Sequence, residues 1–193
     1  MKTLTFAKKF INLKYEIAQA FEVISDGKCG CLSKGCFNIG KHQLEINDKD
    51  FGTTDKKIVD RMWSLRPTAN LLIHTGTRNS LLVIDVDKRN DGLSNLIKLR
   101  KEFPEMDDTF IVETGSGGFH YYFKCNDFIE SSTNIPYGGI DLRGENGYVI
   151  GPGSSHKSGH SYKVVNDVRV NKISNKLIEF LKSCYRQLKE KPS

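Results

Sequence analysis

Two aspartates separated by one residue are the clearest sign of chemistry in this sequence. Asp85 and Asp87 close an apolar, β-branched stretch that favours a strand. Side chains two residues apart on a strand point to the same face, and two carboxylates on one rigid face repel each other unless a cation lies between them. Mg²⁺ or Mn²⁺ suits such hard oxygen ligands. The alternative is a strand that ends in an acidic turn, where both carboxylates are merely solvated.

A third carboxylate, Asp141, follows a pair of glycines and stands between two apolar residues. Taken alone, it is better explained as a turn residue. Joined to Asp85 and Asp87, it completes a set that can hold two ions, which would activate an attacking hydroxyl and stabilise a leaving pyrophosphate. Arg143 follows on the same face of an extended segment. It is either a salt-bridge partner of a carboxylate or a clamp for a triphosphate.

A glycine-rich turn, Thr114–His120, supplies candidate phosphate contacts. Gly117 and Gly118 allow backbone N–H groups to turn toward an anion, and Ser116 can donate a hydrogen bond. His120 begins the next strand and can reach a phosphate oxygen, although a histidine satisfied by ordinary partners at a hairpin is the commoner case. No Gly-Lys-Ser/Thr follows the glycines, so the turn is not a P-loop.

A second polar loop, residues 151–157, contains Ser154 and His156. Both side chains can line the same pocket as the glycine-rich turn. A flexible hairpin explains the loop equally well, because glycine, proline and serine are common in turns.

Three of the five cysteines fall within eight residues. A cytosolic chain does not normally keep disulfides, so the cluster indicates a metal site. Thiolates with a nearby imidazole fit a closed tetrahedral zinc site, although the spacing differs from that of a standard zinc finger. Three free thiols in a loop are the alternative. The expected zinc ligands are Cys29, Cys31, Cys36 and His42.

The elements that position these residues mix strands with helices. The pattern predicts helices over 4–13, from a cap at Thr54 or Asp55 to about Leu65, over Leu93–Phe103 and over Ile173–Leu188. It predicts strands over Leu71–His74, Leu81–Val86, Thr109–Glu113, Phe119–Lys124, Gly139–Leu142, Tyr148–Gly151 and Tyr162–Val165.

The first two of these strands are separated by a short polar stretch and are interpreted as a hairpin, and the second of them as a central strand covered on both faces. Hairpins in place of regular β-α-β crossovers indicate an α+β fold. We expect one domain over 1–193, with a largely irregular zinc-binding loop region at 25–53 and a tail or linker beginning at 183–193.

Composition narrows the setting. The formal net charge of +6 permits a polyanionic partner without requiring one, and a hydrophobic fraction of 38% is enough for one core. No apolar stretch is long enough to span a membrane, and the first residues resemble no signal peptide. We therefore expect a cytoplasmic protein that has no membrane partner.

These elements, in this order, resemble the bifunctional primase-polymerase family within the archaeo-eukaryotic primase superfamily. The resemblance covers about residues 29–165. Segments common in the family are also similar to Cys29–His42 and Asn70–Gly76. The three family motifs match Asp85-Val86-Asp87, Thr114–Phe123 and Ile140–Gly144, the last followed by Gly147–Ser154.

The resemblance implies a catalytic core whose palm is similar to an RNA-recognition-type β-sheet, with an α/β N-terminal portion that carries the zinc loop. It implies that Asp85, Asp87 and Asp141 bind two Mg²⁺ or Mn²⁺ ions and that Ser116 and His120 meet the incoming triphosphate. The zinc would be structural. The full set of expected nucleotide-binding residues is Ser116, Gly117, Gly118, His120, Arg143, Ser154 and His156.

The expected activity is that of a DNA primase and DNA polymerase, which makes primers de novo from nucleoside triphosphates and extends them on a single-stranded DNA template. The alternatives are a polymerase that extends primers but cannot start them, a metal-dependent nuclease, and a non-catalytic zinc module that binds single-stranded nucleic acid. The family's usual helicase region is absent from this sequence. Further domains of a longer parent protein are expected, and plasmid replication, phage genomes and CRISPR-associated systems stay open as settings.

Overall fold

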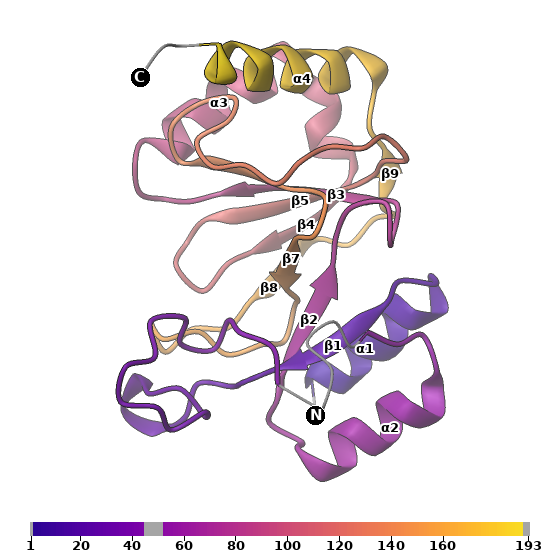
Figure 1. The fold of residues 1–193 in the computed structure, drawn as a ribbon, viewed down its shortest axis with the longest axis vertical. Coiled ribbons are helices and arrows are strands. Elements are labelled where there is room, and N and C mark those ends of the chain that lie inside the picture. The colour runs from indigo at the N-terminus through magenta and orange to yellow at the C-terminus, as the bar shows by residue number, and fades with distance from the viewer. Residues whose placement is uncertain (1, 45–51, 191–193) are drawn as a thin grey trace. The chain divides into compact units, whose positions relative to one another are not determined.

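The computed structural model describes residues 2–44 and 52–190 (Figure 1). The chain divides into two compact units, and each is described by itself. The first unit comprises Met1–His74, Thr114–Ser116 and Tyr148–Lys163. The second comprises Thr75–Glu113, Gly117–Gly147 and Val164–Ser193.

A three-stranded antiparallel sheet, in the order β1-β2-β7, forms the centre of the first unit. Every residue of the central strand β2 is buried. Helices α1 and α2 pack together, and the Trp63 indole of α2 donates a hydrogen bond of 3.0 Å to Thr3 of α1. The elements are α1 (Lys2–Asn12), β1 (Ile17–Ala20), η1 (Ser25–Gly27), α2 (Lys56–Leu65), β2 (Asn70–His74) and β7 (Tyr148–Ile150).

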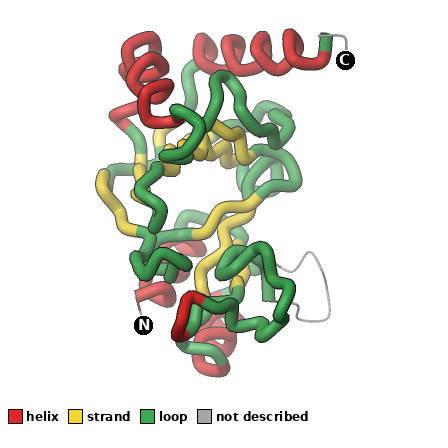
Figure 2. Tube along the Cα trace, turned by 90° about the vertical axis from the view of Figure 1, so that its left-hand side faces the viewer, coloured by secondary structure: helices red, strands yellow, loops and turns green. Residues whose placement is uncertain are grey.

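The segment between β1 and α2 is mostly loop where it is described. Figure 2 draws its loops in green and the short helix η1 in red. This agrees with the irregular region expected at 25–53, of which residues 45–51 lie outside the described part. The α2 helix begins where the sequence predicts. The Asp55 carboxylate accepts hydrogen bonds from the amides of Lys57 and Ile58, which satisfies two of the donors that a helix start leaves open.

The second unit is built on a six-stranded sheet in the order β6-β3-β5-β4-β8, with β9 paired in parallel to β5. Strands β6, β3, β5 and β4 are each antiparallel to their neighbours in this order. The elements are β3 (Leu81–Val86), α3 (Gly92–Glu102), η2 (Pro104–Asp108), β4 (Phe110–Glu113), β5 (Phe119–Lys124), β6 (Ile140–Arg143), β8 (Lys163–Asn166), β9 (Asn171–Lys172) and α4 (Asn175–Lys189).

One face of this second sheet carries the core. Helices α3 and α4 lie on the same side of the sheet in Figure 1, and their apolar residues join the sheet's in one cluster. Leu82, Ile84 and Val86 contribute from β3, alternating with Val83 and Asp85. Because neighbouring residues of a strand point to opposite faces, Asp85 must lie on the face away from the helices.

The mixed α+β class and the predicted helices are confirmed, but the hairpin between the first two strands is wrong. Strand β2 pairs with β1 and β7, whereas β3 pairs with β5 and β6, so the two lie in different sheets. Thr75 and Thr77 of the connection are held instead by the distant 144–147 turn, through the Gly144 carbonyl and the Glu145 carboxylate. None of the described helices is long and apolar enough to cross a membrane.

Candidate active site

Three strands of the second unit bring polar side chains into one row across the sheet. Asp85 of β3 lies opposite His120 of β5 on one side and opposite Asp141 of β6 on the other. Directly opposed residues of antiparallel strands have Cβ atoms about 4.5–5.5 Å apart and share a face. The His120 Nε2 atom is 3.4 Å from Asp85 Oδ1. Two predicted metal ligands and one predicted phosphate contact are therefore neighbours.

Arg143 bridges the two carboxylates of the row. Its Nη2 atom is 3.0 Å from Asp85 Oδ2 and 2.9 Å from Asp141 Oδ2. The structure thus places Arg143 as a salt-bridge partner of both aspartates. About a third of the side chain is exposed, so the guanidinium is not locked in by its surroundings.

The electrostatics of the row depend on these contacts. Burial alone would raise the pKa of Asp85, but His120 and Arg143 outweigh it and hold that pKa well below its usual range. Asp141 behaves in the opposite way. Burial raises its pKa, the Asn134 amide and Arg143 lower it, and the nearby charges of Asp85 and Asp87 raise it further. Negative charge is therefore crowded around Asp141.

Asp87 lies beyond the last residue of β3 and pairs with its own turn. The Arg89 Nη2 atom is 2.6 Å from Asp87 Oδ2, and the Arg89 amide donates to Asp87 Oδ1 at 2.9 Å. The hydrogen bond from the Arg89 side chain is the main reason that the pKa of Asp87 is lowered. Asp85 and Asp141 are therefore direct neighbours across the sheet, whereas Asp87 follows the end of β3 and is paired with Arg89.

All three of these side chains end in carboxylates, the donor type that divalent cations prefer. Asp85 and Asp87 destabilise the charged form of Asp141. Two guanidiniums, from Arg89 and Arg143, supply the positive charge in this state. Hard cations prefer such oxygen ligands, and they would relieve the same repulsion once the arginines moved aside.

The glycine-rich turn contacts β3 closely. A Cβ atom on Gly118 would lie 2.1 Å from the Val86 carbonyl oxygen, so no larger residue fits there without a backbone shift. Gly117 has a φ of 82°, in the left-handed region that favours glycine. The two glycines therefore have a structural reason to be present, besides the phosphate contact expected of them.

Three other predicted nucleotide-binding residues belong to the first unit. Ser116 is exposed, and its hydroxyl is 3.0 Å from that of Thr114. Ser154 is fully buried and accepts a hydrogen bond of 2.9 Å from the Leu71 amide, which ties its loop to β2. His156 is buried, with Nδ1 3.0 Å from the Ser158 hydroxyl. Their contact with a nucleotide stays a prediction.

The cysteine cluster is assembled as the sequence predicts. One donor atom from each of the four residues lies within 4.8 Å of all the others, and together they could hold a metal ion. The His42 Nε2 atom is 3.2 Å from Cys29 Sγ and 3.5 Å from Cys36 Sγ. The four residues are Cys29, Cys31, Cys36 and His42.

The pKa values of two thiols in the cluster are shifted in opposite directions. Burial would raise the pKa of Cys29, but hydrogen bonds, the first from the Gly40 amide, lower it to about 7. Desolvation and the neighbouring Cys29 and Cys31 raise the pKa of Cys36 to about 11. A bound cation would stabilise all three thiolates at once.

Residues 38–177, more than half of the chain, match the family described as bifunctional DNA primase/polymerase, N-terminal. The chain belongs to this family. Primase and polymerase activity on DNA and nucleotides is the general property of its members. A comparison with curated proteins found no match. The family match includes His42 but begins after the three cysteines.

One residue that supports the candidate site, Asn134, was not predicted. The Asn134 amide donates to Asp141 Oδ1 at 3.0 Å, and its side chain accepts from the Gly139 amide at 2.9 Å. Asn134 therefore fixes both ends of the turn that precedes β6. Its φ of 56° suits asparagine, which tolerates the left-handed region. That preference was the one available signal.

The loop that carries the cysteine cluster is anchored by polar side chains that no sequence pattern singled out. Arg66 pairs with Glu22 at 2.8 Å and also donates to the Gly30 carbonyl at 3.1 Å. Asn70, fully buried on β2, donates to the Gly40 carbonyl at 2.8 Å. These bonds hold the loop at both ends of the cysteine cluster.

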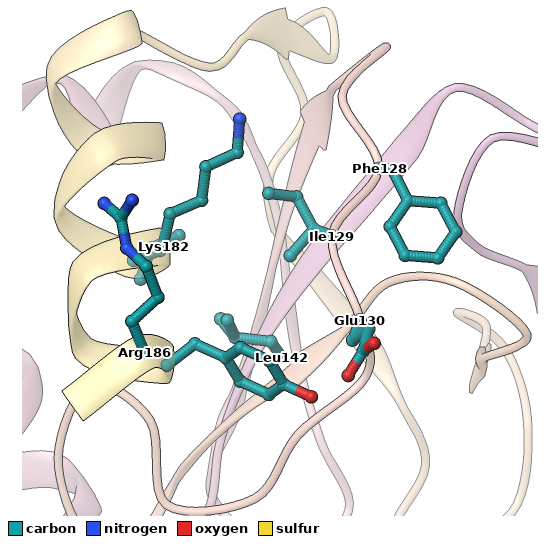
Figure 3. Close-up of a pocket in the computed structure, with 8 residues that line it drawn as sticks. Phe128, Ile129, Glu130, Leu142, Lys182 and Arg186 are labelled. Atoms are coloured by element: carbon teal, nitrogen blue, oxygen red, sulfur yellow. The ribbon is translucent and has the colours of Figure 1, made fainter. Parts of the chain in front are cut away.

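A cavity of about 240 Å³ in the second unit lies beside α4 (Figure 3). Leu142 of β6 lines it together with Ile129 and side chains of α4. Leu142 alternates with Asp141 and Arg143, so the cavity lies on the opposite face of the sheet from the carboxylate row. Lys182 near its rim pairs with Asp127 at 2.6 Å. The cavity therefore has no part in the candidate active site.

Proposed function

We propose that the domain is a template-dependent nucleotidyltransferase that makes DNA primers de novo and extends them on single-stranded DNA. The observation that carries the proposal is the row of Asp85, Asp141 and His120 on the helix-free face of the second sheet, with Arg143 between the two carboxylates. Family membership supports primase/polymerase chemistry in general.

Asp85, Asp87 and Asp141 would hold two divalent ions, which when bound lower the pKa of an attacking 3′-hydroxyl and neutralise the departing pyrophosphate. In that state Arg143 would turn from the carboxylates toward the triphosphate, because it is partly exposed and a guanidinium forms paired hydrogen bonds with phosphate. His120 lies beside Asp85 and would donate from its ring to a phosphate oxygen. Positioning and charge stabilisation would supply most of the rate gain.

The sheet itself would serve as the palm. Four antiparallel strands, in the order β6-β3-β5-β4, carry two helices on one face and the polar row on the other. We infer that it corresponds to the RNA-recognition-type palm expected of the family, which would leave the face with the polar row to nucleotide and template. The Ser116 hydroxyl and the backbone of Gly117 and Gly118 would contribute further phosphate contacts.

The ion expected in the cysteine cluster is zinc. Zinc bonds of about 2.3 Å to sulfur and 2.0–2.1 Å to nitrogen in a tetrahedron place the donor atoms less than about 4 Å apart. The four donor atoms lie within 4.8 Å of one another, so a small inward movement would bring them to zinc-binding distances. The cluster ties the ends of a long loop together, so the zinc would support folding. Ligands closed on all four sides leave no open position for catalysis.

The test is synthesis of labelled product on an unprimed single-stranded DNA template with Mg²⁺ or Mn²⁺. Wild type should give short products, and Asp85→Asn/Asp87→Asn should give none while keeping the circular-dichroism spectrum of the folded protein. Its melting temperature should fall, because Asp85 loses its ion pairs with Arg143 and His120. Asparagine is a better replacement than alanine at position 85, because it keeps a side-chain oxygen that can accept a hydrogen bond from Arg143 or His120.

Other outcomes select the alternatives. Extension of a supplied primer without products on the unprimed template would leave a polymerase that lacks initiation. Degradation of the template, abolished in the double variant, would indicate a nuclease. Binding without any synthesis or degradation, and without dependence on divalent ions, would leave a nucleic-acid-binding zinc module.

A further inference from the structure

The tip of the zinc loop exposes large apolar side chains. Phe37 is 95% exposed and Leu32 is 78% exposed, the two highest values for large hydrophobic residues in the described part of the chain. Single exposed apolar residues are common on protein surfaces, so the exposure of Phe37 indicates a contact surface only together with its charged surroundings. Phe37 directly follows Cys36, one of the four clustered donors.

This loop is held in shape by the cluster within it and by hydrogen bonds from Arg66 and Asn70. The cysteine and histidine donors lie within 4.8 Å of one another, Arg66 donates to the Gly30 carbonyl, and Asn70 donates to the Gly40 carbonyl. The ring is therefore presented on a fixed support, and little conformational freedom would be lost when a partner binds.

The surroundings of Phe37 are basic. Between residues 25 and 42 the chain has three lysines, Lys28, Lys34 and Lys41, and one acidic residue, Asp26. The segment stays positive even with the single negative charge that three thiolates leave on a divalent ion. Lys28 and Lys34 are exposed, and they line a pocket of about 440 Å³ together with Cys29 and Cys36 of the cluster and the apolar residues Leu32 and Ile39.

We propose that the zinc loop is a contact surface for single-stranded nucleic acid. Phe37 stacks on a base, while Lys28 and Lys34 contact the flanking phosphates. An aromatic ring beside cations fits this ligand, because every base has a face to stack on and the backbone is negative throughout. Stacking of this kind does not depend on base identity, as a template contact requires. The inference rests on the proposed function, since it assigns the surface that meets the template.

The experiment measures binding of a fluorescent single-stranded oligonucleotide by anisotropy, with zinc-loaded protein at several salt concentrations. Phe37→Ala should weaken binding roughly 5- to 150-fold, and Phe37→Trp should retain it. Phe128→Ala is the matched control, because Phe128 is 64% exposed in the second unit. It should change the affinity less than twofold. Zinc content and melting temperature should stay unchanged in all three.

The lysines give an independent readout. Lys28→Ala/Lys34→Ala should weaken binding and reduce the slope of log affinity against log salt by about 1.4, since each phosphate contact on a single strand contributes about 0.7. Running the same titrations with DNA and RNA oligonucleotides shows which backbone is preferred. Unchanged affinity in Phe37→Ala, or no binding by wild type, overturns the proposal and leaves the ring as a protein-docking residue.

Failure of this inference is distinguishable from failure of the proposed function. If wild type makes no product but its binding depends on Phe37, the catalytic proposal fails and the surface assignment stands. If wild type synthesises primers and Phe37→Ala neither weakens binding nor raises the template concentration needed for half-maximal rate, the surface assignment fails alone.

Discussion

Removal of the Arg143 charge should make the domain depend on divalent ions for its stability. In the described structure this guanidinium is 2.9–3.0 Å from both Asp85 and Asp141. Arg143→Met keeps most of the side chain's length and removes its charge. The two carboxylates are then left facing each other, with the His120 ring 3.4 Å from Asp85.

The expected loss can be worked out from burial. Breaking a fully buried ion pair costs about 3–5 kcal/mol. Here about a third of Arg143 and about a fifth of each aspartate side chain are exposed, so screening by water reduces this to about 2–3 kcal/mol. For a chain of this size, that corresponds to a melting temperature lower by about 5–10 °C. Arg143→Lys keeps a positive charge and should lose less.

Divalent ions should then recover much of the loss. An ion present at 100 times its dissociation constant stabilises the folded state by about 2.7 kcal/mol. Thermal melting with and without Mg²⁺ or Mn²⁺ should show a larger upward shift for Arg143→Met than for wild type, and none for Arg143→Met/Asp85→Asn/Asp141→Asn. Equal shifts in all three proteins, or an unchanged melting temperature in Arg143→Met without metal, would refute the reasoning.

Three further predictions concern support of the site. Gly118→Ala should lower the free energy of unfolding by at least about 1–3 kcal/mol in chemical denaturation, because its Cβ would lie 2.1 Å from a carbonyl oxygen, whereas Gly35→Ala, with nothing within 4 Å, should be neutral. Cys36→Ser should release metal during purification, measured by metal analysis, and should melt at a lower temperature. Burial alone would raise the pKa of Glu22, but Arg66 more than offsets it and the pKa is lowered. The pair therefore stabilises the fold above about pH 4.5 and loses this effect as pH falls below it, so Glu22→Gln should flatten the acid limb of a stability–pH curve.

Patterns among residues close together in the sequence were enough to predict several features of the fold and the site. The apolar run Leu81–Val86 was enough to predict the strand that carries Asp85, and the structure has that strand. The short spacing of the cysteines was enough to predict one cluster, because few residues separate the donors. The Asp55 cap of α2 also follows from a local preference.

The rest depended on contacts between distant parts of the chain. The polar stretch after β2 resembles a hairpin turn, but Thr75 and Thr77 bond to the 144–147 turn and the chain passes into another sheet. Asn134 and Asn70 support the carboxylate row and the zinc loop through bonds to residues that no spacing rule connects with them. Whether Arg143 meets carboxylates or a phosphate could not be decided from its position two residues after Asp141.

The division of the chain has a consequence for how the protein can be dissected. The backbone passes from one unit to the other at five points, and the turn between β4 and β5 contributes only Thr114–Ser116 to the first unit. Neither unit is encoded by one continuous stretch of the gene. No single truncation can therefore isolate either unit: a chain that ends at residue 163 keeps the whole first unit but still carries Thr75–Glu113 and Gly117–Gly147 of the second. Individual contributions are better separated by point substitutions than by deletion.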